Sequence, residues 1–240
     1  MMAQAYPSHQ LLIGALPVEV TLKPIKHLHL SVLPPDGAVR ISAPQGMSPD
    51  HLRAYAIGKL GWIRKQQARY SGQQRESARQ VIERESHALW GRRLLLHIEE
   101  LNAAPRIEVH PTHLILYLRP GSSLQKRQSI LAAWYRNELR REAADLIDHW
   151  QRRLGVEINR LFVQAMTRQW GSCNPATRNI RLNTQLAQKP RACLDYIVLH
   201  ELAHLRVRTH GEEFLALLDS LQPDWQERRR LLNDLPILDR

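Results

Sequence analysis

The sequence reads His200-Glu201-Leu202-Ala203-His204 in a stretch, residues 191–210, that contains no proline or glycine. Residues four apart on a helix share one face, with Cβ atoms roughly 5 to 6 Å from each other. The two imidazoles can therefore bind one ion at zinc–nitrogen distances of about 2.0 to 2.1 Å. Glu201 projects about 100° further around the helix axis, where its carboxylate can reach a water at the metal without binding the metal itself. The spacing predicts a catalytic zinc site.

A third ligand is expected shortly after this segment. His210 follows His204 by six residues, and Thr209, His210 and Gly211 fit a turn that brings the chain back toward the metal. Glu212 and Glu213 are weaker alternatives for the same role. The competing interpretation is that these are ordinary solvated or hydrogen-bonded histidines. We predict His200, His204 and His210 as metal ligands, Zn²⁺ as the cofactor and Glu201 as the catalytic residue.

The elements around the segment predict a mixed fold. Pro190 fits the first position of the helix that carries the histidines. Two short strands, Leu161 to Val163 and Ile180 to Leu182, are joined by a loop that contains residues 170–175. A long amphipathic helix precedes them and ends at Gly155, a residue suited to a left-handed cap.

The N-terminal part is expected to be richer in strands. Apolar residues alternate through 27–43 on both sides of a Pro-Pro-Asp-Gly turn, which is typical of a β-hairpin. Ser48 and Pro49 then fit the cap and first position of a helix. Further strands are expected near 92–98, 107–109 and 114–118. The fold class is therefore α+β, with a small N-terminal sheet plus helices, and a C-terminal part with the metal-binding helix and a short antiparallel sheet.

Loop residues at 119–123, Arg-Pro-Gly-Ser-Ser, form the best candidate boundary in the chain. They divide the chain into an N-terminal β-rich α+β region, 1–120, and a catalytic domain, 121–240.

Composition narrows the functional classes. The formal net charge of +11 can attract nucleic acid or a phosphorylated ligand, although basic and acidic residues are mixed along the helices, as on an ordinary solvated surface. No segment approaches the roughly 20 apolar residues of a membrane span, and no basic segment precedes the apolar residues near the start. Two cysteines are too few for a disulfide framework, so we expect a cytoplasmic protein with no membrane partner.

The C-terminal third of the chain resembles the YgjP-like metallopeptidase family, a relative of the SprT-like and minigluzincin zinc proteins. The resemblance is carried by these residues: Trp170 to Cys173, Ile180 to Asn183, Leu186, Pro190, Asp195 to Val198, His200 to His204, His210, Phe214 and Pro223 to Trp225. It implies a zincin-like, minigluzincin-type domain with His200, His204 and His210 as zinc ligands and Glu201 as the catalytic glutamate. Leu215 stands where relatives often have tryptophan.

Members of that family are called metallopeptidases, and some are described as UTP pyrophosphatases. A peptidase that acts on a peptide or protein substrate is the first expectation. A nucleoside triphosphate pyrophosphatase and a nucleic-acid-associated protease are the alternatives. The sequence offers no glycine-rich phosphate loop and no carboxylate cluster for Mg²⁺, which disfavours the pyrophosphatase.

Several neighbouring residues have two interpretations each. Tyr196 is a candidate for stabilising the oxyanion, although packing is the simpler role. The strand that ends at Leu182 is a candidate for pairing with an extended peptide, with Asn183 and Trp170 at the cleft. Asn183 could equally cap a turn and Trp170 could fill the core. Cys173 and Cys193 are expected to be small buried residues.

Overall fold

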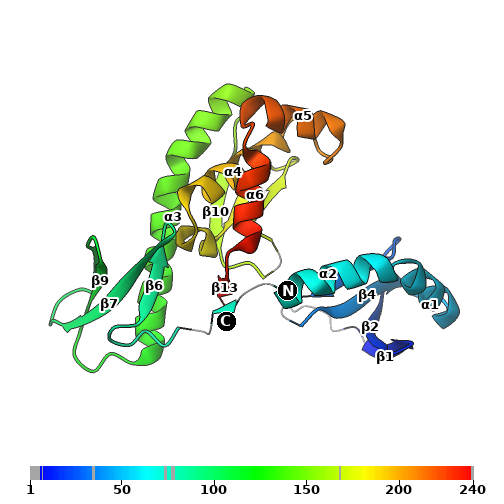
Figure 1. Ribbon diagram of the computed structural model, residues 1–240, viewed down its shortest axis with the longest axis horizontal. Helices are drawn as coiled ribbons and strands as arrows, with labels where there is room; N and C mark the ends of the chain where they lie inside the picture. The colour runs from blue at the N-terminus through cyan, green and yellow to red at the C-terminus, as the bar shows by residue number, and fades with distance from the viewer. Residues whose placement is uncertain are drawn as a thin grey trace. The chain divides into compact units, whose positions relative to one another are not determined.

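The computed structural model describes residues 6, 8–33, 36–72, 75–76, 79–167 and 169–238. The chain folds into two compact units, Met1–Gln74 and Arg75–Arg240. Figure 1 shows the first unit in blue to cyan and the second in cyan to red. Each unit has its own hydrophobic core.

The N-terminal unit is a four-stranded sheet with two helices. Its elements are β1 (Ser8–Ile13), β2 (Leu16–Lys23), β3 (His29–Leu33), β4 (Ala38–Pro44), α1 (Pro49–Gly58) and α2 (Leu60–Gly72). The predicted hairpin is confirmed, because β3 and β4 pair antiparallel. Ser48 caps α1 as expected, accepting a hydrogen bond from the backbone N–H of His51 at 3.3 Å. The strands β1 and β2 were not predicted, and they complete the sheet in the order β1-β2-β4-β3.

The C-terminal unit begins with a second four-stranded sheet. Its strands are β6 (Ser86–Leu89), β7 (Arg92–Glu100), β8 (Arg106–Val109) and β9 (His113–Leu118), in the order β6-β7-β9-β8. The buried leucines of this sheet share one core with the long helix α3 (Leu124–Leu154). At the turn between β6 and β7, Gly91 has a φ of +80°, and a Cβ there would lie 2.9 Å from Cγ of Pro190. This hairpin therefore packs closely against Pro190, the N-cap residue of the helix that carries His200.

The boundary expected at residue 120 lies inside this unit. The loop 119–123 joins β9 to α3, and residues from both sides of it belong to one core. Turn-forming residues mark a loop, but they do not reveal whether the elements on its two sides pack together. The division in the structure falls between Gln74 and Arg75.

A smaller sheet lies next to the helix that carries His200. Its strands are β10 (Arg160–Gln164), β11 (Gly171–Asn174) and β12 (Asn179–Asn183), in the order β10-β12-β11. The expectation of a short antiparallel sheet is wrong in one respect: β10 and β12, the two predicted strands, pair parallel. The reason is β11, which reverses the chain between them and pairs antiparallel with β12. Gly155 ends α3 with a φ of +64°, as predicted.

Three helices and a short connection complete the unit. They are the 3₁₀ helix η1 (Thr184–Gln188), α4 (Arg191–Ala203), α5 (Glu212–Leu221) and α6 (Trp225–Asp234). Helix α4 packs against α3, α5, α6 and β11, and its apolar side is fully buried at Val198, Leu199, Leu202 and Ala203. Near the C-terminus, β13 (Ile237–Leu238) pairs with β5 (Arg75–Glu76). None of the described helices combines the length and the apolar character that a membrane crossing requires.

Candidate metal centre

Three histidines from two consecutive elements meet at one point. His200 lies on α4, His204 is the C-cap residue of α4, and His210 immediately precedes Gly211, the N-cap residue of α5. One nitrogen of each ring lies within 4.8 Å of the others, and no other set of three potential ligands among the described residues meets this condition. The sequence placed His204 inside the helix, but α4 ends at Ala203, so the chain turns back immediately and returns His210 to His200.

The ring nitrogens are arranged as a donor set for one cation. Nε2 of His200 and Nε2 of His210 are 3.0 Å apart. Two ligands of a tetrahedral zinc ion at bond lengths of about 2.0 to 2.1 Å would be about 3.4 Å apart, so a small adjustment suffices. Nδ1 of His204 is 3.2 Å from the backbone carbonyl of Val207, which leaves Nε2 for the ion. The residues present therefore fit a zinc ion.

The ring of Phe214 packs against all three imidazoles. Its ring centroid lies 5.1 Å from His200, 4.7 Å from His204 and 4.9 Å from His210. The side chain is fully buried on α5. One aromatic ring thus restricts the orientation of all three histidine side chains. In the sequence, the only sign of this role is that Phe214 follows His210 by four residues.

Burial keeps the histidines in the form that binds metal. It lowers the pKa of His200 to about 3, and the neighbouring rings of His204 and His210 act in the same direction. Burial also lowers the pKa of His204. A neutral imidazole has a lone pair for a cation, so these two side chains could bind a metal ion without first having to lose a proton.

Glu201 lies on the neighbouring face of α4, pressed against β11. Its side chain is 5% exposed. A Cβ added to Gly171 would lie 2.6 Å from its Oε1, so only glycine leaves room for the carboxylate. Burial raises the pKa of Glu201 to about 8, and a hydrogen bond from the backbone N–H of Cys173 opposes that rise. The carboxylate is therefore held by the strand, and it forms no ion pair with any residue that the structure describes.

The strand beside Glu201 has a free edge among the described residues. The sequence assigned peptide pairing to the strand that ends at Leu182, but this strand, β12, is central and pairs on both sides with β10 and β11. The edge position belongs to β11. This strand was not predicted, because Gly171-Ser172-Cys173-Asn174 is not a typical strand sequence.

Asp195 anchors α4 to the helices around it. Its Oδ1 accepts a hydrogen bond from Nε1 of Trp150 at 2.7 Å, and its Oδ2 accepts one from Nε2 of Gln222 at 2.9 Å. Arg228 on α6 forms an ion pair with the same carboxylate. One carboxylate on α4 thus connects this helix to α3, to the end of α5 and to α6, about one and a half turns before His200.

The remaining predicted residues have structural roles in this fold. Tyr196 is 4% exposed, and its ring stacks on Trp225 at 6.2 Å and lies edge-on to His200 at 5.7 Å. Asn183 accepts a hydrogen bond from the backbone N–H of Gln185, so its capping role is confirmed. Trp170 and Cys173 are partly buried against the core, and Cys193 is fully buried. Glu212 and Glu213 lie in the exposed first turn of α5, outside the cluster of ligand atoms.

A second group of histidines does not form a comparable site. Strand pairing brings the ring of His97 within 5.1 Å of that of His113, and the rings of His110 and His113 stack at 4.6 Å. The nitrogens of these three rings do not meet the 4.8 Å condition that the first triad meets. His97 instead pairs with Glu83 at 2.8 Å.

A search of curated proteins returned no match. Among solved structures, the chain is similar to the metallopeptidase zymogen jannalysin of Methanocaldococcus jannaschii, with 24% identity and a TM-score of 0.34 over 37% of this chain and 85% of that one. It is also similar to the metallopeptidase zymogen abylysin of Pyrococcus abyssi, with 20% identity and a TM-score of 0.34 over 38% of this chain and 97% of that one.

The family model described as "YgjP-like, metallopeptidase domain" matches residues 26–235 and therefore spans most of both units. This chain belongs to the YgjP-like metallopeptidase family.

Proposed function

We propose that this protein is a zinc-dependent peptidase in which His200, His204 and His210 hold the ion and Glu201 is the general base. The observation that carries the proposal is the convergence of one nitrogen from each histidine within 4.8 Å. The buried carboxylate of Glu201, the residue after His200, supports the proposal, because this carboxylate has no other ionic partner among the described residues. On this proposal, α4, the three-stranded sheet and α5 form a zincin-like catalytic region within residues 121–240.

When bound, zinc polarises the scissile carbonyl and lowers the pKa of a coordinated water toward about 7. Glu201 accepts a proton from the attacking water as the oxygen–carbon bond forms. The carboxylic acid then delivers that proton to the nitrogen of the leaving amine as the carbon–nitrogen bond breaks. General acid–base catalysis of this kind contributes about 10² to 10⁴ in rate.

The free edge of β11 is the proposed place for the substrate backbone. An extended peptide can add to an exposed strand through main-chain hydrogen bonds. Gly171 and Cys173 belong to β11 and touch the Glu201 carboxylate. A peptide paired with this strand would therefore run past the general base.

The experiment that tests this function is Glu201→Gln in zinc-loaded protein, assayed against a library of peptides. Zinc content should persist, because Glu201 is not among the proposed ligands, while turnover should fall by about 10² to 10⁴. Glu213→Gln, on the exposed first turn of α5, is the matched control and should retain wild-type turnover. Equal turnover in Glu201→Gln and wild type would remove Glu201 from the mechanism.

The same proteins should be assayed for pyrophosphate release from UTP. Wild-type release that disappears in Glu201→Gln, without any peptide cleavage, would replace the peptidase by the nucleotide pyrophosphatase. Peptide cleavage without pyrophosphate release is the result we expect.

A further inference from the structure

The N-terminal unit carries much of the positive charge of the chain. Residues 1–74 contain eight lysines and arginines but only three acidic residues. Less than a third of the chain therefore supplies nearly half of its net charge of +11. No acidic residue occurs between residues 51 and 74, the part of the sequence that contains α2. Basic and acidic residues are mixed along the long helix α3, but α2 carries positive charge only.

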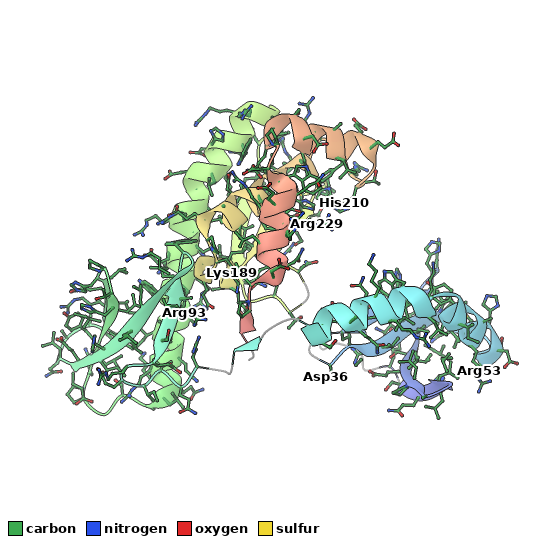
Figure 2. The ribbon with its side chains drawn as sticks, viewed as in Figure 1. Asp36, Arg53, Arg93, Lys189, His210 and Arg229 are labelled. Atoms are coloured by element: carbon green, nitrogen blue, oxygen red, sulfur yellow. The ribbon has the colours of Figure 1, made fainter. Side chains whose placement is uncertain are left out.

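The three acidic residues of this unit lie elsewhere. Glu19 alternates along β2 with buried valines that share a core with α2, so it lies on the other face of the sheet, where it pairs with Arg40. Asp50 pairs with Arg53 on α1. Asp36 is in the turn between β3 and β4, and Figure 2 labels Asp36 and Arg53 at opposite ends of the unit. No acidic side chain on α2 itself offsets the charge of its cations.

Helix α2 turns one face to the core and the opposite face to solvent. Ile63 is fully buried in the N-terminal core. The exposed residues of the helix include Gly61, Trp62, Arg64, Lys65 and Ala68. Two of these residues are small, and a Cβ added at Gly61 would meet no atom within 4 Å. The backbone between the cationic side chains is therefore accessible to a ligand.

Trp62 is a large aromatic side chain on this solvent face, and it is 43% exposed. Lys59 and Lys65 precede and follow it by three residues, so both are its neighbours on the helix surface. Lys59 belongs to the first turn, because its backbone carbonyl accepts a hydrogen bond from the N–H of Ile63 at 2.9 Å. Lys59, Arg64 and Lys65 form no ion pair within the described part of the chain. An exposed indole thus stands between two unpaired ammonium groups.

We propose that the solvent face of α2 binds single-stranded nucleic acid, with a base stacked on Trp62 and the phosphates held by Lys59, Arg64 and Lys65. Proteins that bind single strands combine cations that follow the phosphate backbone with aromatic side chains on which bases stack. The bases of a duplex are already stacked on each other, so a single strand is the form that presents a base to Trp62. The inference is independent of the proposed peptidase function, because every residue that carries it lies in the N-terminal unit.

Two other anionic partners fit this face less well. A helix that lies in a membrane surface buries a broad apolar face in the lipid. In α2, the other large apolar side chains, Leu60, Ile63 and Tyr70, pack against the core. The carboxylates of an acidic peptide would pair with the cations but would leave the flat face of the indole without a stacked base.

The test is a titration of the full-length protein with a fluorescein-labelled thymidylate oligomer of about 20 nucleotides, followed by anisotropy between about 50 and 200 mM salt. Trp62→Ala should raise the Kd about tenfold at each salt concentration, because it removes the stacking surface. It should leave the slope of log Kd against log salt concentration unchanged, because stacking releases no counterions. Trp62→Phe, which keeps an aromatic ring, should retain most of the affinity.

Variants of the cations measure the ionic part of the binding. Lys65→Gln should lower the salt slope by about 0.7, and a triple variant that also carries Lys59→Gln and Arg64→Gln should lower it by about 2. The matched controls are Lys126→Gln and Leu124→Ala, which change an exposed charge and an exposed apolar side chain on α3. Both controls should keep the wild-type Kd and slope.

Several results would overturn the inference. One is an oligomer that does not bind wild type in about 50 mM salt, and another is an equal Kd for wild type and Trp62→Ala. A duplex of the same length should bind both proteins equally, and a tenfold loss with the duplex as well would exclude a role for Trp62 specific to single strands. Vesicles with phosphatidylserine and polyglutamate are the rival ligands: binding of either one that depends on Trp62, without binding of the oligomer, would replace nucleic acid by that partner.

Discussion

The carboxylate of Glu201 lies against the backbone of Gly171, so close that a Cβ at Gly171 would be 2.6 Å from Oε1, 2.8 Å from Cγ and 3.0 Å from Cδ of the glutamate. Glu201 is on α4 and Gly171 begins β11. The contact joins the proposed general base to the strand on which we place the substrate.

Gly171→Ala should therefore displace Glu201 and reduce kcat by about one to two orders of magnitude, as expected when an acid–base group loses its position. Zinc content should not change, because Gly171 does not contact the triad. Steady-state kinetics with metal analysis measures both. The control is Gly61→Ala, a helical glycine with no atom within 4 Å of the added methyl group; equal kcat values in the two variants would contradict the positional role of Gly171.

Lys189 should make stability depend on pH in the alkaline range. Burial lowers its pKa from 10.5 to about 8, and its ammonium group donates a hydrogen bond to the carbonyl of Pro236. Between those two pH values the unfolded chain holds the proton and the folded chain does not, so the free energy of unfolding should rise as the pH increases from about 8 to about 10.5.

Urea unfolding across this pH range gives the free energy of unfolding against pH for wild type and for Lys189→Met. The difference between these two curves measures the effect of Lys189. The rise should be smaller in Lys189→Met, while the exposed Lys126→Met should follow wild type. Parallel curves for Lys189→Met and wild type would exclude Lys189 as the source.

Asp195→Ala should destabilise the C-terminal unit by about 2 to 4 kcal/mol, because it leaves the buried N–H of Trp150 without its acceptor and removes the ion pair that joins α4 to Arg228 on α6. Chemical unfolding measures the loss. Asp148→Ala, at an exposed position of α3, should change stability by less than about 0.5 kcal/mol. A loss no greater in Asp195→Ala than in Asp148→Ala would mean that this network does not hold α4.

The C-terminal unit should fold as residues 75–240, whereas 121–240 alone should not. The shorter fragment lacks β7 and β9, whose buried leucines share a core with α3, so its helix would expose that apolar surface. Circular dichroism and thermal melting of both fragments test this. A cooperative transition in 121–240 would instead support the domain boundary that the sequence suggested.

Local sequence patterns predicted the helices and strands whose conformation is determined by the residues within them. Alternation through 27–43 gave the β3–β4 hairpin, and Gly155 marked the end of α3 because a left-handed residue is needed there. The spacing of His200 and His204 placed two ligands on one helical face. The structure brings His210 to them and leaves Glu212 and Glu213 in exposed positions.

Features that depend on tertiary contacts were not predictable in the same way. The strand β11 has weak local preference, and its pairing with β12 makes it a strand. The need for glycine at position 171 comes from Glu201, thirty residues later. The ring of Phe214 and the carboxylate of Asp195 likewise gain their roles only when α5 and α6 pack against α4. Sequence periodicity contains no information on these distances.

Zinc binding by chelator-stripped protein tests the central claim most directly. One equivalent of zinc should bind per chain, X-ray absorption should show three imidazole nitrogens at about 2.0 to 2.1 Å, and saturating zinc should raise Tm by about 5 to 10 °C. His204→Ala should lose the rise in Tm while its metal-free form still folds. A wild-type protein that binds no zinc, or a His204→Ala variant that binds it as tightly as wild type, would contradict the account.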